Sequence, residues 1–263
     1  MRAHAEIAAV LRRDGSTALA RLRGAAPLLP RPTGEGRVHL VGGAAGPLPG
    51  DELSLEVVVG PGATLVVGAT GATVAHPGPD PEAPASTLAV RIDVAAGASL
   101  VWLGEPLIAA AGCRHTTVTE VTLAADARLL LRELLVPGRT AEAPGDAASE
   151  LWVHRAGLPV LAQRVAVGPA SPGWAGAAVL AGARCAGSLV VVGPEVPDRT
   201  VVLSEPPLDG PGARCALVPL AAGGAVLATA LGPAPLVGRL LDRAAALATG
   251  RAGTDLGTVD TAG

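Results

Sequence analysis

Lysine, asparagine, phenylalanine and tyrosine are all absent from this chain of 263 residues, and three tryptophans are its only aromatic side chains. Without lysine, the chain cannot contain the Gly-Lys-Ser/Thr sequence with which a P-loop holds nucleotide phosphates. The shortage of aromatic rings also argues against a carbohydrate-binding module, because such sites depend on aromatic surfaces. A core without rings must instead be stabilised by many small contacts among Val, Leu and Ala.

Several patterns that signal catalysis are also missing. The sequence contains no His-Glu-x-x-His helix, no Cys-x-x-Cys pair, no Gly-x-Ser-x-Gly turn and no Gly-x-Gly-x-x-Gly loop. These patterns carry zinc, redox, nucleophilic and dinucleotide chemistry respectively. We therefore predict that the protein is not an enzyme and that it holds no tightly bound cofactor.

Charge and cysteine content narrow the choice of partners and compartment. The net charge is −3, with no block of one sign, so neither nucleic acid nor a membrane surface is expected as a partner. Arg2 and Glu6 interrupt the N-terminal apolar residues, which excludes a secretory signal there, and no apolar run reaches the length of a membrane span. Three widely spaced cysteines fit a reduced, cytoplasmic protein better than a disulfide framework.

One sequence pattern occurs three times. The stretches "VVVGPGATLVV", "DVAAGASLVW" and "TLAADARLLL" each place a short turn between two apolar runs, and the turns contain Gly62, Gly97 and Asp126. The apolar residues alternate with polar ones at a period of two, which predicts β-strands. We therefore predict a mainly all-β protein of two stacked sheets built from tandem hairpins, similar to a β-solenoid or sandwich.

The rest of the chain continues this pattern. A hairpin is expected around residues 156–159, short strands at 188–193, 199–204 and 215–220, and loops at 76–86 and 138–149. Residues 6–13 fit either a helix or a strand. The one clear amphipathic helix is expected at 234–248, ending at Gly250. We predict a single domain over residues 1–250 and a disordered tail over 251–263.

Two carboxylates and one Cys/His pair are the candidate functional residues. Asp51 follows a Gly/Pro-rich loop, where its side chain could accept backbone N–H groups. Glu133 lies in the apolar run "LLLRELLV", so either the end of that strand is solvated or Glu133 lines a polar interior path. Cys113 and His115 would lie on one face of a strand, either as half of a soft-metal site or as a small buried cysteine next to an exposed histidine.

Several segments, taken in order, resemble the urease accessory protein family UreD, also called UreH. They are "GAAPLLPRP", "VHLVGGAAGPLPGDELSLEVVVGPGATLVV", "GATGAT" and "GASLVWLGEPLIAAAGCRHTTVTEVTLAADARLLLRELLVPGR". The resemblance covers residues 25–139 well and the remainder loosely. It departs at residues 74–78, where "VAHPG" replaces a Lys-Val-Tyr-Arg stretch of the family.

The resemblance implies a β-rich scaffold that joins the accessory proteins UreF and UreG to the urease apoprotein during nickel delivery. UreG is the GTPase of that scheme, which agrees with the absence of a P-loop here. The family is thought to pass Ni²⁺ through a water-filled channel, and Asp51 and Glu133 match its acidic positions. They are therefore the candidates for lining a transient nickel path. The alternative is a β-solenoid interaction or carbohydrate-binding module without a metal role.

Overall fold

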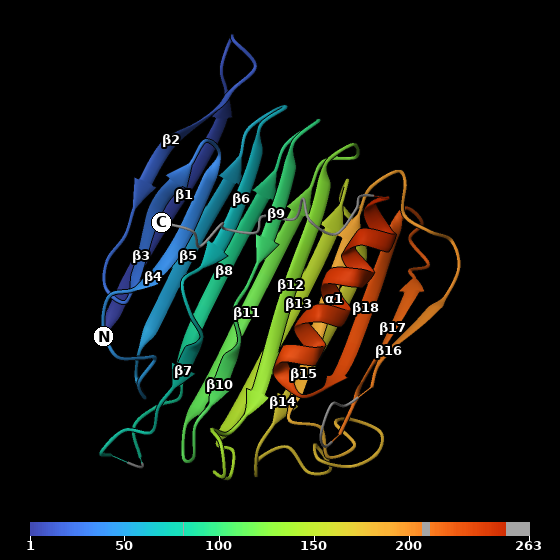
Figure 1. Ribbon diagram of the computed structural model, residues 1–263. Coiled ribbons are helices and arrows are strands. Elements are labelled where there is room, and N and C mark those ends of the chain that lie inside the picture. The colour runs from blue at the N-terminus through green and yellow to red at the C-terminus, as the bar shows by residue number, and fades with distance from the viewer. Residues whose placement is uncertain (81, 207–210, 251–263) are drawn as a thin grey trace, which may run out of the picture.

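Two β-sheets lie face to face in the computed structural model, and a single helix covers part of one of them (Figure 1). The structure describes residues 1–80, 82–206 and 211–250. The all-β class, the stacked sheets with their solenoid-like arrangement and the C-terminal helix are all confirmed. The proposed tail from residue 251 onward lies outside the described residues, and the single-domain boundary stays a prediction.

Sheet A contains seven strands, and its central members run parallel to one another. In spatial order they are β14 (Leu158–Val167), β13 (Asp146–Arg155), β11 (Arg114–Leu123), β8 (Ser86–Val94), β5 (Glu52–Val59), β1 (Arg2–Leu11) and β2 (Thr17–Arg23). The segment at residues 6–13, which fitted a helix or a strand, belongs mostly to β1. The loop predicted at 138–149 is shorter than expected, because β13 already begins at Asp146.

Sheet B contains eleven strands. Nine form a continuous path in the order β16 (Val201–Glu205), β17 (Ala213–Pro219), β18 (Ala225–Gly232), β15 (Cys185–Val192), β12 (Arg128–Pro137), β9 (Ser99–Leu103), β6 (Thr64–Ala69), β4 (Arg37–Gly42) and β3 (Leu28–Gly34). The short strands β10 (Leu107–Ala109) and β7 (Thr73–Ala75) extend the sheet beside β12. Strand β12 is central and largely buried.

The three repeated units are not hairpins, which corrects the predicted connection. In each unit the first strand lies in sheet A and the second in sheet B, so the turn arches from one sheet to the other. Each strand then pairs in parallel with its equivalent in the next unit, as Leu55 does with Val90. The apolar–turn–apolar pattern is the same for a hairpin and an arch, so periodicity alone cannot distinguish them.

The three arches share one turn structure. Ala63 donates its N–H to the Gly60 carbonyl, and Ala98 and Ala127 make the same bond to the residue three positions earlier. Gly62 has a φ of 69°, in the left-handed region that glycine enters without strain. Successive turns are also bonded to each other, because Ser99 N–H donates to the Ala63 carbonyl. The repeated sequence therefore encodes a stack of turns.

A true hairpin joins β13 to β14, as predicted, with Ala156 and Gly157 at its tip. Both have positive φ values, 52° and 78°, which matches the two-residue turn that antiparallel strands favour. The strands expected at 188–193, 199–204 and 215–220 correspond to β15, β16 and β17.

The period-two pattern of the strands builds the main core between the sheets. Inward positions of β5 are buried, whereas Glu56 and Val58 point outward. A second core lies between sheet B and α1 (Ala234–Thr249), where Val237, Leu240 and Leu241 are fully buried. Gly250 ends this helix in a left-handed conformation, as predicted. No helix in the described ranges has the length and apolar character needed to cross a membrane.

Candidate functional site

A cavity of about 370 Å³ lies between the two sheets, at the end nearest β7 and β10. Its walls are mainly apolar, and they also include two glutamates, two histidines, one arginine, one glutamine and several serine and threonine residues. The polar residues facing it from between the sheets are His115, Thr117, Thr119, Glu133, Ser149, Gln163 and Ser188.

The cavity exists because the inward face of each central strand changes character along its length. On β11 the inward residues Val121 and Leu123 are buried in the main core, whereas Thr117 and Thr119 line the cavity. Register aligns these polar stretches across sheet A, since Thr117 pairs with Ser149. In sheet B, Glu133 pairs with Ser188. Polar residues at inward positions of several strands therefore lie side by side at the same height along the sheets.

Glu133 on β12 bridges the space between the sheets. Thr119 donates its hydroxyl to Glu133 Oε1 at 3.0 Å, and Ser149 donates to Oε2 at 2.8 Å. Both donors belong to sheet A, whereas Glu133 belongs to sheet B. The structure therefore supports the second of the two sequence interpretations, in which Glu133 lines a polar interior space.

The Glu133 carboxylate has no cationic partner among the described residues. Desolvation by the surrounding side chains raises its pKa, and the hydrogen bonds from Ser149 and Thr119 oppose that rise. A carboxylate held by neutral hydroxyl groups in a desolvated cavity retains an uncompensated attraction for a cation.

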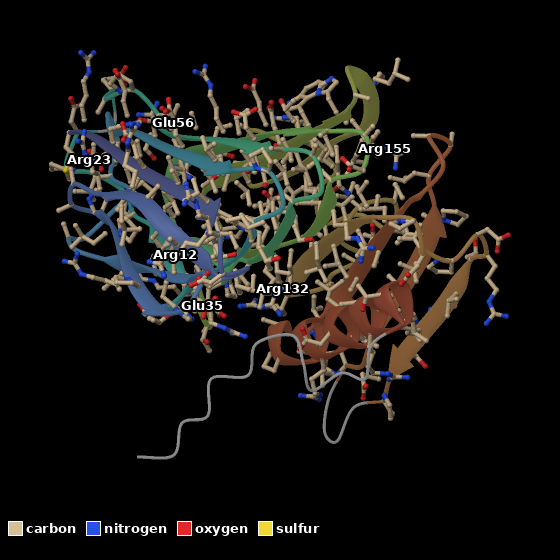
Figure 2. All side chains as sticks on the ribbon, turned by 90° about the horizontal axis from the view of Figure 1, so that it is seen from above. Arg12, Arg23, Glu35, Glu56, Arg132 and Arg155 are labelled. Carbon is tan, nitrogen blue, oxygen red and sulfur yellow. The ribbon has the colours of Figure 1, made fainter. Side chains whose placement is uncertain are left out.

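Arg132 lies on the opposite face of β12 and does not pair with Glu133. Its guanidinium contacts Asp242 of α1 at 3.0 Å and Glu105 at 3.8 Å. Figure 2 shows Arg132 beside the helix, on the outer side of sheet B. Side chains of adjacent residues on a strand point to opposite faces, so sequence neighbours here are separated by the sheet.

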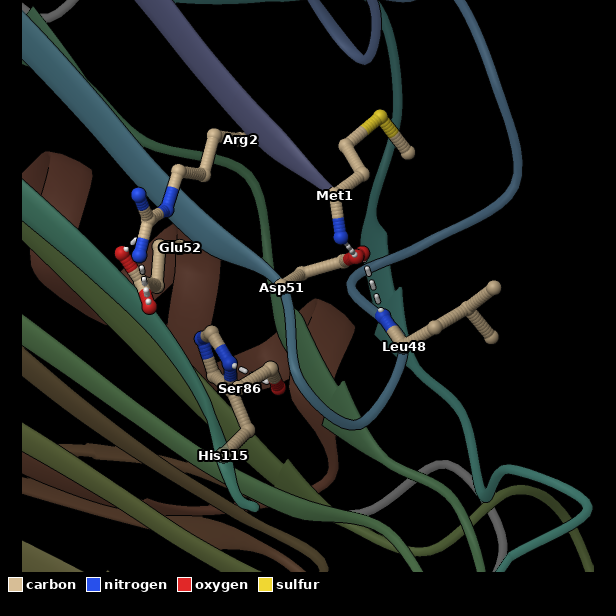
Figure 3. A network of polar contacts seen from close by, with 7 residues as sticks. All are labelled: Met1, Arg2, Leu48, Asp51, Glu52, Ser86 and His115. Atoms are coloured by element: carbon tan, nitrogen blue, oxygen red, sulfur yellow. Dashed lines mark hydrogen bonds and ion pairs between the residues drawn. The ribbon is translucent and has the colours of Figure 1, made fainter. Parts of the chain in front are cut away.

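Asp51 is buried but does not share a wall of the cavity with Glu133. Its Oδ1 lies 2.7 Å from the Met1 ammonium, and its Oδ2 accepts the Leu48 N–H at 2.9 Å (Figure 3). The side chain therefore stabilises the turn before β5, as the position after a Gly/Pro-rich loop predicted. A metal contact of Asp51 stays a prediction, and the structure does not bring the two candidate carboxylates together.

Cys113 and His115 both lie in the interior, so the expectation that His115 is exposed was wrong. Neither residue belongs to a group of three potential metal ligands among the described residues. The Cys113 thiol points to the Asp146 carbonyl, and desolvation raises the pKa of Cys113 to about 11. The His115 imidazole bonds to Ser86 at 2.9 Å (Figure 3) and to Thr117 at 3.0 Å. Burial lowers the pKa of His115 to about 4, so the ring is neutral at pH 7.

Sequence reasoning missed the hydroxyl groups that surround Glu133. Ser149 was assigned to a loop. A signal was available in "HTTVTE", where Thr117 and Thr119 occupy inward positions whose equivalents on β5 and β8 are apolar. A run of inward polar side chains on a central strand indicates a cavity, because those groups need partners.

The fold and site define a stacked, solenoid-like β-protein with an internal cavity. The sequence model of the family described as UreD urease accessory protein matches residues 2–252. The chain is 42% identical over 274 residues to the urease accessory protein UreD of a Parafrankia species, covering 95% of this chain and 90% of the relative. It is 45% identical over 239 residues to UreD 3 of Streptomyces griseus, covering 88% of this chain and 90% of that relative.

A third relative, UreD of Streptomyces avermitilis, is 44% identical over 253 residues, with 93% of this chain and 96% of that protein covered. Family match and relatives agree over nearly the whole length. The chain therefore belongs to the UreD family of urease accessory proteins, which supports a role in urease maturation.

Proposed function

We propose that this chain is a non-enzymatic scaffold that docks UreF and the GTPase UreG on the urease apoprotein, and that Ni²⁺ crosses its inter-sheet cavity. Family membership supports the role in maturation. The observation that carries the nickel step is the Glu133 carboxylate, which faces the cavity with hydroxyl partners and without a counter-cation.

The chemistry of the cavity suits passage better than storage. Carboxylate and hydroxyl oxygens hold a hydrated divalent ion weakly, whereas thiolates and several imidazoles would retain it. The thiol of Cys113 bonds toward a backbone carbonyl, and the three cysteines are buried and free. Free thiols also support the proposed cytoplasmic location. Nickel is thus cargo in transit, and no cofactor is held permanently.

A carbohydrate-binding module is the alternative function, and the tryptophans do not favour it. Trp102 lines the cavity, Trp152 is 42% exposed on the outer face of sheet A, and Trp174 packs in a third cluster. These rings lie on separate parts of the protein, so they cannot form one stacking platform for a sugar.

The test assembles wild-type protein, Glu133→Gln and Glu133→Leu with UreF, UreG and apo-urease. Complex yield, Tm and nickel loaded per urease are measured for each. We expect normal assembly by both variants, several-fold lower nickel loading with Glu133→Gln, and a larger loss with Glu133→Leu, which removes polar groups from the cavity. Glu150→Gln is the matched control, because Glu150 pairs with Arg164 on the outer face of sheet A.

Two results would count against the proposal. Normal nickel loading by both Glu133 variants would remove Glu133 from the nickel path. Failure of the wild-type chain to form a complex with UreF and UreG would reject the scaffold role itself.

A further inference from the structure

We propose that the outer face of sheet B, in the part beside α1, binds one amphipathic helix of a partner protein that carries acidic side chains on its flank over β4. The inference rests on the proposed scaffold role and gives one of its contacts a place and a chemistry. Helix α1 packs mainly on β12, β15, β16, β17 and β18, and it leaves β9, β6, β4 and β3 largely uncovered (Figure 1).

An apolar strip of Leu130, Val101, Leu103 and Val66 forms the floor of this surface. Leu130 of β12 pairs with Val101 of β9, and Val101 pairs with Val66 of β6. The sequence neighbours of these residues face the main core, so the strip side chains point to the outer face. Leu130 is buried in the core beneath α1, whereas Val101 and Val66 stay half-buried. The apolar floor of the α1 contact therefore continues past the helix.

The strip has the width of one helix. Three strand spacings separate β12 from β4, which is about 14 Å at about 4.8 Å each, and packed helices lie about 8–10 Å apart. The flank of α1 that borders the strip is marked by Asp242, which contacts Arg132 of β12. Gly238 and Ala246, four residues to either side, share that flank. A methyl group added at Gly238 would meet no atom within 4 Å, so a second helix can lie close beside α1.

Three arginines without partners surround the strip. Arg37 of β4 pairs directly with Val66, Arg31 lies on the neighbouring strand β3, and Arg128 begins β12. All three alternate with buried inward residues, so they point outward. None forms an ion pair in the ranges that the structure describes. The chain as a whole carries a net charge of −3, so this positive rim is a local feature, and an acidic partner surface complements it.

The acidic side chains near the strip are already engaged. Glu105 and Asp242 both contact Arg132, at 3.8 Å and 3.0 Å, so charge on the α1 side is largely neutralised. Glu35, in the turn between β3 and β4, accepts the Thr17 N–H at 3.1 Å and is directed to β2. Positive charge therefore remains on the β4 side alone, which places the acidic flank of the bound helix there.

Retention of the chain by each maturation component tests the charge requirement. Arg31→Gln/Arg37→Gln removes two rim charges, and Arg199→Gln/Arg214→Gln is the matched control, because those arginines are exposed elsewhere. Each variant is co-expressed with tagged UreF, tagged UreG or tagged apo-urease, and the chain retained is measured in low and high NaCl. For one component we expect the rim variant to be retained about fivefold less in low salt, with little further loss in high salt. The control should behave as wild-type protein does.

A second pair of variants tests the apolar floor. Val66→Asp places a carboxylate under the bound helix, where it is desolvated and repelled by the acidic flank, so retention of the same component should be lost. Val202→Asp is the matched control, because Val202 is a valine of β16 that is 74% exposed. It should leave retention unchanged. Retention by the other two components and Tm values show that Val66→Asp is folded.

Thiol labelling locates the contact directly. The three native cysteines are buried, so a Val66→Cys variant provides the reactive thiol. A maleimide should label it in complexes that lack the identified component and should not label it in complexes that contain that component. Protection in every sample that ends only when residues 251–263 are removed would show that the chain covers its own strip, which overturns the proposal.

The remaining outcomes separate this inference from the scaffold role. Unchanged retention of both the rim and the floor variants, while wild-type protein binds, overturns the inference alone. A change in self-association without a change in component binding overturns it in favour of a second copy of the chain. Failure of wild-type protein to bind any of the three components rejects the scaffold role itself.

Discussion

Arg132 and Glu133 are adjacent in the sequence, yet they experience different environments. Arg132 is neutralised by Asp242 on the helix side of sheet B, whereas Glu133 accepts two hydroxyl hydrogen bonds between the sheets. Removing the Glu133 charge therefore leaves no cation unpaired. This geometry decides what a substitution there does to the fold, because the usual penalty for breaking a buried ion pair does not apply.

At neutral pH, Glu133→Gln should leave the free energy of unfolding unchanged or raise it. The folded-state pKa of Glu133 is raised by desolvation, so the folded state loses stability as pH rises above the ordinary carboxyl value of 4.5. Glutamine does not titrate and can still bond to Thr119 and Ser149. Urea unfolding from pH 5 to 8 should show the advantage of the variant growing with pH.

The control for this measurement is again Glu150→Gln, whose carboxylate is half-buried on the outer face of sheet A and paired with the exposed Arg164. It should show little difference from wild-type protein at any pH, because surface ion pairs contribute little. A marked destabilisation of Glu133→Gln at pH 7 would mean that the carboxylate is a structural element of the core.

His115 should make the fold sensitive to acid. Its pKa is lowered to about 4 in the folded state, so below the ordinary value of 6.5 the unfolded chain binds a proton that the folded chain does not. Stability should therefore fall as pH drops from 6.5 to 4, by about 3 kcal/mol in total. His115→Gln should show a shallower loss over this range in denaturant titrations.

The same residue provides a functional check with its neighbour Cys113. If both are structural, Cys113→Ala/His115→Ala should leave urease activation within about twofold once the loss of stability is taken into account. Abolished activation in a variant that folds and assembles normally would restore the idea of a direct soft-metal site.

How far the site could be predicted depends on whether its contacts are local. The carboxylate of Glu133 stood out because it interrupts an apolar run. Its partners Thr119 and Ser149 come together only through the register of parallel strands. A single sequence does not contain that register, because strands separated by an arch can be aligned in several ways.

At the scale of elements, the alternation of apolar residues predicted the strands and their buried faces well. Leu53 and Leu55 are buried while Ser54 and Glu56 face outward, as the period of two requires. The predicted pairing of the two strands within each repeat was wrong, because a hairpin and an arch place the same residues inward. The conformation of the turn determines whether a unit is a hairpin or an arch. The hydrogen bond between residues three positions apart that closes this turn cannot be recognised from the sequence.

Helix α1 packs unusually close to sheet B at Gly187 of β15. A methyl group added there would lie 2.6 Å from Val237 Cγ1 and 2.8 Å from Leu241 Cδ1. Gly187→Ala should therefore displace the helix and lower the free energy of unfolding by about 1–3 kcal/mol. The change is measured by chemical denaturation.

Gly193→Ala is the matched control, because no atom lies within 4 Å of the added methyl group. It should leave the unfolding midpoint nearly unchanged. Equal stability of the two variants would show that the contact between α1 and sheet B relaxes without cost.

At the scale of the whole molecule, the outer face of sheet A is not covered by any helix of the described chain. Val10, Val58 and Trp152 are exposed on it by 41%, 45% and 42%. Sheets with parallel central strands are normally covered on both faces. We therefore expect the protein to aggregate when produced alone and to be recovered in soluble form with a co-expressed partner.

Soluble yield and light scattering, with and without the partner, measure this effect. Val58→Thr should improve recovery of the isolated chain without changing its fold, because threonine keeps the β-branched shape and adds a hydroxyl. Ready purification of the unmodified chain as a stable monomer at high concentration would show that this face needs no cover.

The arched connections also determine the order in which the chain can acquire structure. A strand of one repeat keeps one edge unpaired until the next repeat has been made. Strand β5 already pairs with β1, for example, but Leu55 pairs with Val90 only when β8 has followed, and Leu65 pairs with Leu100 only when β9 has followed. Only the hairpins, such as β13–β14, can form from adjacent segments. Bringing distant segments together is slow, since chain entropy is lost before contacts compensate for it. During synthesis the parallel parts of both sheets therefore grow one strand at a time from the N-terminal side. Each new strand leaves an unpaired sheet edge until the following repeat has been made.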